Sequence, residues 1–151
     1  MSQPQGFSPS HLGICVRHLE RSLRFYCDGL GFAKAETFDV TDAFAAALEV
    51  DGEVVGTSQF VRHGGMRIEL LAYRSPGVAG EPARRRNQLG ITHLSFVVDD
   101  VDAAARHLVA CGGRLLPETR TGSDPGATQL VFVADPDGVR IELMSNPLPL
   151  S

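Results

Sequence analysis

The 151-residue chain contains no tryptophan, only three cysteines and no large excess of either charge. Cys15, Cys27 and Cys111 are odd in number and lack the paired spacing of a metal site. A disulfide framework is therefore excluded as the basis of the fold. This sparse use of cysteine is typical of a reducing compartment, so we expect a cytoplasmic protein.

Long apolar runs are also missing. No stretch approaches the ~20 apolar residues of a membrane-spanning helix, and residues 1–10 have neither the charged nor the apolar region of an export signal. The net charge of −4 argues against a nucleic-acid surface, and the basic run at 84–86 is too local to change this. We expect a small-molecule partner, with no nucleic acid and no membrane.

An internal repeat is the main feature that is present. Residues 11–32 align with residues 93–114 at an offset of 82, which places His11 on His93. Further on, GMRIELL at 65–71 returns as GVRIELM at 138–144, at an offset of 73. A repeated unit of one strand, one helix and further strands indicates two similar modules. We assign residues 8–74 and 90–145 to these modules and residues 75–89 to a linker, within a single domain spanning 1–151.

Hydrophobic periodicity locates the elements of each module and predicts an α+β protein. The expected strands are 11–17, 32–40, 54–62, 66–73, 91–98, 128–134 and 139–145, with a weak strand at 114–116. The expected helices are 19–30, 99–111 and a short segment at 42–50 that Thr41 caps. Residues 118–126 are expected to form a loop.

Strand parity separates two faces, because residues two apart point to the same side of a strand. Aliphatic residues occupy one parity of the four strongest strands and should pack on the helices. The opposite parity carries four polar residues at equivalent positions of the repeat: His11, Glu69, His93 and Glu142. Two carboxylates on one face would repel each other, and a divalent cation removes that cost. The pattern therefore predicts a metal site with two imidazole and two carboxylate ligands.

Single polar residues on a strand have a simpler interpretation than this set of four. A single histidine or glutamate in such a strand more often belongs to a solvated face, and it is the fourfold coincidence that favours ligands. Arg67 and Arg140 are repeat mates on the ligand parity; they could bind a substrate carboxylate or simply flank the mouth of the cavity. Cys15 and Tyr73 share that parity and are expected to line a substrate pocket.

The motifs HLGICV…IELL and THLSFVVDDVDAA…DPDGVRIELM resemble the vicinal oxygen chelate superfamily (glyoxalase/bleomycin resistance/dioxygenase family) over residues 8–145. The resemblance implies two tandem βαβββ modules whose sheets form a barrel-like cup, and a homodimer. It also implies one divalent metal ion per site, held by His11, Glu69, His93 and Glu142. Nitrogen and oxygen ligands suit Zn, Ni, Co, Mn or Fe(II).

The complete ligand set resembles glyoxalase I and methylmalonyl-CoA epimerase, in which the substrate loses a proton next to a carbonyl. This implies an isomerase, epimerase or glyoxalase-like lyase, with Glu142 as the first choice of base and Glu69 as the second. Glyoxalase I carries glutathione-binding Arg and Asn residues where this chain has Cys15 and Tyr73, which argues against a glutathione substrate. A non-catalytic drug- or metabolite-binding protein and a dioxygenase are the alternatives. The pattern leaves open whether the site lies within one chain or between two.

Overall fold

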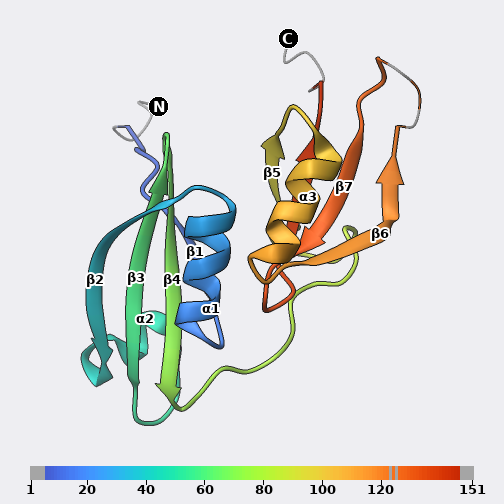
Figure 1. Cartoon of the computed structure of the whole chain (residues 1–151). Coiled ribbons are helices and arrows are strands. Elements are labelled where there is room, and N and C mark those ends of the chain that lie inside the picture. Colours follow the sequence, from blue (N-terminus) through green and yellow to red (C-terminus); the bar gives the residue numbers. More distant parts are fainter. Residues whose placement is uncertain (1–5, 123, 125, 147–151) are drawn as a thin grey trace, which may run out of the picture.

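The computed structural model describes residues 6–122, 124 and 126–146, and it has the α+β architecture expected from the sequence (Figure 1). The first sheet has the order β1-β4-β3-β2 and the second the order β5-β8-β7-β6. The strands of the first sheet are β1 (Leu12–Cys15), β2 (Ala33–Thr41), β3 (Val55–His63) and β4 (Met66–Ser75). Those of the second are β5 (Leu94–Val97), β6 (Arg114–Thr121), β7 (Leu130–Ala134) and β8 (Arg140–Met144). In each sheet the first strand pairs parallel to the last and the other pairs are antiparallel.

One helical segment precedes the second strand of each module. In the first module it consists of α1 (Leu19–Leu23) and the π-helical η1 (Arg24–Gly29); in the second it is α3 (Val101–Ala110). Asp100 begins α3 by accepting a hydrogen bond at Oδ1 from the Ala103 N–H at 2.8 Å. A short 3₁₀ turn, η2 (Asp42–Phe44), and α2 (Ala45–Leu48) follow in the first module and have no counterpart among the described residues of the second. In the part of the chain that the structure describes, no helix has the length and apolar character to cross a bilayer.

Both helical segments lie between the two sheets (Figure 1). A single core of buried side chains joins them to both sheets and includes Phe25, Tyr26, Ile68, Leu108 and Ile141. The helices approach closely because η1 ends in a glycine: a Cβ on Gly29 would lie 3.0 Å from Leu108 Cδ2. Since the aliphatic face of each sheet points into this common core, the opposite face of each sheet points outward.

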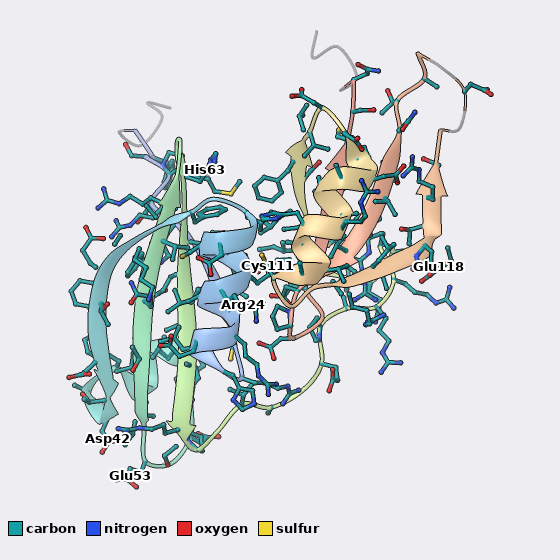
Figure 2. All side chains as sticks on the ribbon, in the orientation of Figure 1. Arg24, Asp42, Glu53, His63, Cys111 and Glu118 are labelled. Atoms are coloured by element: carbon teal, nitrogen blue, oxygen red, sulfur yellow. The ribbon has the colours of Figure 1, made fainter. Side chains whose placement is uncertain are left out.

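Polar contacts also join the modules. The buried Tyr26 hydroxyl donates to Asp135 Oδ2 at 2.9 Å, while Asp135 Oδ1 accepts from the backbone N–H groups of residues 137, 138 and 139. Arg24 donates to the Ala110 carbonyl at the end of α3, and Figure 2 shows Arg24 and Cys111 in the region between the modules. These bonds fix the helical segment of the first module on the second.

Three details of the expected elements were wrong. Strand β6 continues to Thr121, through part of the expected loop at 118–126, of which residues 123 and 125 lie outside the described residues. The pairing of β6 with β7 shifts register after Leu116, and the Thr119 hydroxyl bridges the irregular stretch by accepting from the Phe132 N–H and donating to the Leu116 carbonyl. The expected helix at 19–30 changes to π geometry at Arg24.

The third detail concerns the expected cap of the short helical segment. Thr41 precedes η2 but its side chain makes no capping hydrogen bond. The next residue, Asp42, makes a different contact: its Oδ1 accepts from the Val54 N–H at 2.6 Å. This hydrogen bond ties the helical segment to the start of β3.

Candidate metal centre

The first module brings His11 and Glu69 together on the outward face of its sheet. His11 directly precedes β1, and Glu69 lies on the neighbouring β4, where it pairs with Gly13. His11 Nε2 is 3.2 Å from Glu69 Oε2, and the two side chains are 34% and 19% exposed. The parallel pairing of β1 with β4 therefore converts two residues 58 positions apart (69 − 11) into neighbours.

The second module repeats this arrangement. His93 precedes β5 closely, and Glu142 lies on β8 opposite Ser95. His93 Nε2 is 3.7 Å from Glu142 Oε2. The two pairs thus occupy equivalent places in the duplicated unit, as the repeat predicted.

A hydroxyl group contacts the histidine of each pair. The Nδ1 atom of His11 lies 2.8 Å from Ser10 Oγ, and that of His93 lies 2.7 Å from Thr92 Oγ1. When Nδ1–H donates to this hydroxyl, the lone pair of Nε2 is directed at the neighbouring glutamate and is free to bind a metal. This is the tautomer that a metal ligand requires, and both hydroxyls are placed to accept from it.

Aromatic rings support both imidazoles. Phe60 on β3 contacts His11 edge-to-face at 5.1 Å between centroids, and Phe132 on β7 contacts His93 in the same way at 5.3 Å. The repeat did not indicate these two residues, because they align at an offset of 72, one less than the glutamates. Ser10 and Thr92 were also missed, although they align at the offset of 82 that matched the histidines.

Each pair fits a divalent metal ion. Two ligands ~2.1 Å from one ion, at angles of ~90–110°, lie ~3.0–3.4 Å from each other, and the observed Nε2–Oε2 distances of 3.2 and 3.7 Å are close to this range. Neutral imidazole nitrogen and carboxylate oxygen are also suitable donors for the metals named above. The pairs are thus half-sites, each able to provide two ligands.

The four expected ligands do not meet within one chain. Among the residues that the structure describes, no three His, Cys, Asp or Glu side chains are close enough together to share an ion. The reason is the packing of the modules, because the helical segments lie between the sheets and the ligand-bearing faces point outward. The described part of one chain therefore holds two separate His–Glu pairs and no four-ligand site.

The four residues expected to contact substrate have different surroundings. Two of them, Cys15 and Arg140, line one cavity of about 200 Å³ together with His93. Tyr73 lies on β4, where burial raises the pKa of its phenol, helped by the nearby Cys15 and Glu69. It therefore remains protonated and can donate a hydrogen bond.

Arg67 is already engaged. Its Nη2 is 3.0 Å from Glu36 Oε2, and its guanidinium lies over the Phe60 ring at 4.2 Å. Its repeat mate Arg140 donates to the Gly138 carbonyl and forms no ion pair with a described residue. The two arginines thus differ in how freely they could bind an anionic substrate.

The sequence is similar to those of several known proteins. The family model described as "Glyoxalase/Bleomycin resistance protein/Dioxygenase superfamily" matches residues 8–143. An uncharacterized protein of Escherichia coli, YaeR, is 31% identical over 88% of this chain and 92% of its own length. A 2-epi-5-epi-valiolone epimerase of Actinomyces sp. is 31% identical over 95% of this chain and 82% of its own length.

The solved structures support the fold. A glyoxalase family protein of Bacillus cereus superposes with a TM-score of 0.78 at 21% identity, over 96% of this chain and 97% of its own. At that identity the likeness concerns the fold alone, and it covers both modules together with the linker.

Proposed function

The chain belongs to the glyoxalase/bleomycin resistance protein/dioxygenase superfamily, and from that premise we propose that it is a metal-dependent enzyme that removes a proton next to a carbonyl of a small metabolite. The observation that carries the proposal is the duplicated His–Glu pair, with Nε2–Oε2 distances of 3.2 and 3.7 Å. The reaction class is isomerase, epimerase or lyase, and the similarity to a relative named as an epimerase supports it.

A second copy of the chain completes each site in this proposal. A two-fold axis would bring the His11–Glu69 pair of one copy to the His93–Glu142 pair of the other, so that a homodimer has two four-ligand sites. The strand orders support this, because β1 and β5 are edge strands of their sheets. Such edges present backbone groups that can pair with another chain.

The residues of this chain have distinct tasks in the reaction. A divalent ion, when bound, supplies positive charge beside the substrate carbonyl and so makes the adjacent proton more acidic. His11 and His93 hold their Nε2 atoms in place through the hydroxyls of Ser10 and Thr92. Cys15 and Tyr73 face the substrate on the side of the first module.

Glu142 is the proposed base. Its Oε2 accepts from Ser95 at 2.6 Å and also faces His93, so Oε1 has no hydrogen bond to a described residue and can accept a proton. Glu69 differs, because its Oε1 accepts from Ser58 at 2.6 Å and its Oε2, which faces His11 Nε2, is the atom that would bind the ion. Glu69 is therefore mainly a ligand and only the second choice of base.

Metal analysis of the purified protein, followed by solvent-deuterium exchange, tests the function. We expect about one divalent ion per chain, as two sites per dimer require, and metal-dependent exchange of the proton next to the carbonyl in 2-oxo, 2-hydroxyketone or acyl-thioester compounds. His11→Ala and His93→Ala should lose metal and exchange together. Stoichiometric metal without exchange in any of these classes would contradict an enzyme and favour a binding protein.

A further inference from the structure

A group of arginines surrounds a second cavity beside the His93–Glu142 half-site. The cavity has a volume of about 580 Å³, and Arg84, Arg114 and Arg140 line it. Arg114 and Arg140 lie in one row across the second sheet, because both strands pair with Ala134 of β7. Arg84 belongs to the linker, which forms the opposite wall.

The linker wall is held in place by several contacts. Arg17 donates to the Gly80 carbonyl at 2.6 Å, and Arg86 donates to the carbonyls of Ala83 and Thr92. Pro82 packs against the turn at Gly138, where an added Cβ would lie 3.6 Å from Pro82 Cγ. These contacts fix the linker as one wall of the cavity, and the three guanidinium groups lie around it.

Few carboxylates are free to neutralise these arginines. Glu81 and Asp137 also line the cavity, but both are near Arg17, at 3.1 and 3.8 Å. Asp135 is buried, and its two oxygens accept from Tyr26 and from three backbone N–H groups. Only Glu118, on β6 (Figure 2), remains as an uncommitted carboxylate among the described lining residues.

Arg84, Arg114 and Arg140 crowd positive charge around one cavity, and Glu118 is the carboxylate that faces them without an ion pair to a described residue. Like charges held together in this way favour binding of an anion.

The first module lacks this feature. There Glu36 lies 3.0 Å from Arg67 and 3.3 Å from Arg62 and so neutralises the equivalent surface. The offset of 82 aligns Glu36 with Glu118, which lines the cavity but forms no ion pair with a described residue. The second module therefore keeps an acid at this position, and the linker adds Arg84 to the arginines that surround it.

We propose that this arginine cavity binds a phosphate-type dianion carried by the substrate, an assignment that rests on the proposed function. Planar guanidinium groups bind phosphate oxygens through paired, charge-assisted hydrogen bonds. Arg140 is two residues from Glu142 on β8, and residues so placed are ~6–7 Å apart. The phosphate and the reacting carbon would then be only a few bonds apart, as in a small phosphorylated hydroxyketone.

Titration of the metal-free protein with inorganic phosphate tests the cavity independently of the metal site. We expect Arg114→Gln and Arg140→Gln each to weaken phosphate binding by roughly ten- to a hundred-fold. Arg85→Gln is the matched control, because Arg85 is the exposed neighbour of Arg84 and does not line the cavity. Equal phosphate affinity in all three variants, or no phosphate binding by the parent protein, would overturn the proposal.

Three further measurements identify the anion and separate this proposal from the proposed function. Malonate should bind more weakly than phosphate, and tighter malonate binding would replace the phosphate assignment with a dicarboxylate. His93→Ala should keep its phosphate affinity while losing metal, whereas joint loss of both would refute an independent cavity. In the metal-loaded protein, dihydroxyacetone phosphate should exchange deuterium at least ten-fold faster than dihydroxyacetone, and equal rates would contradict the assignment.

Discussion

In the first module Glu69 Oε1 accepts from Ser58, Oε2 faces His11, and Arg67 is paired with Glu36. In the second module Glu142 has one oxygen open, and Arg140 forms no ion pair with a described residue. The same His–Glu pair is therefore set in a neutralised surface in one module and in a cationic surface in the other. Under the proposed function, the duplication would have kept the His–Glu pair in both modules and left the reacting side of the site to the second.

The largest expected effect comes from changing the two glutamates in turn. Glu142→Gln keeps the shape and an amide oxygen for the metal but removes the base, so deuterium exchange should fall by roughly 10²–10⁴-fold with most of the metal retained. Glu69→Gln should reduce exchange less, because both oxygens of Glu69 already have partners. Proton exchange followed by NMR, with metal content measured on the same samples, checks both. Equal losses would remove the difference between the modules.

The hydroxyls behind the histidines give an intermediate effect. Thr92→Val removes the group next to His93 Nδ1, and Ser10→Ala does the same for His11. Loss of such outer contacts typically costs ~10–100-fold in metal affinity. Competition with a chelator measures this, and Thr92→Ser, which keeps the hydroxyl, should bind metal as the parent does. A Thr92→Val protein with unchanged affinity would show that the hydroxyl does not orient the ligand.

The smallest effect concerns the contact that joins the modules. Tyr26→Phe deletes the donor to buried Asp135 and should lower the free energy of unfolding by ~1–3 kcal/mol. Burial raises the pKa of Asp135 above its ordinary 3.8, so the folded state holds this proton more tightly than the unfolded state. Stability then falls as the pH rises from 3.8 through the raised pKa.

This pH dependence sharpens the same prediction. The Tyr26 hydroxyl favours the ionised carboxylate, so its removal should raise the pKa of Asp135 further. Denaturant unfolding across the acidic range should therefore show the gap between Tyr26→Phe and the parent widening as the pH rises. A constant gap would mean that the hydroxyl does not interact with the ionised group.

Much of the fold could be predicted from the sequence, and so could the shared face of the four polar residues, because both depend on local periodicity. Parity placed His11, Glu69, His93 and Glu142 on the face opposite the aliphatic residues, and the structure brings them together as two pairs. Whether one chain or two would join the pairs could not be predicted, because it depends on which faces of the sheets meet. That is decided by the packing of the helical segments, including the approach of Gly29 to Leu108.

Two of the details that sequence reasoning missed arise from non-local contacts. The extension of β6 depends on Thr119 bonding to Phe132 across the sheet. The arginine cavity depends on a linker folded onto the second module, which brings Arg84 to Arg114 and Arg140. Neither follows from residues that are close together in the chain.

Mixing two inactive variants tests most directly whether two copies share each metal site. His11→Ala and His93→Ala should each bind little metal alone. In a heterodimer, one site combines both defects and the other combines two intact half-sites, so random subunit exchange should restore about a quarter of the parent's metal and exchange activity. A mixture that recovers neither, although the subunits are shown to exchange, would contradict the shared site.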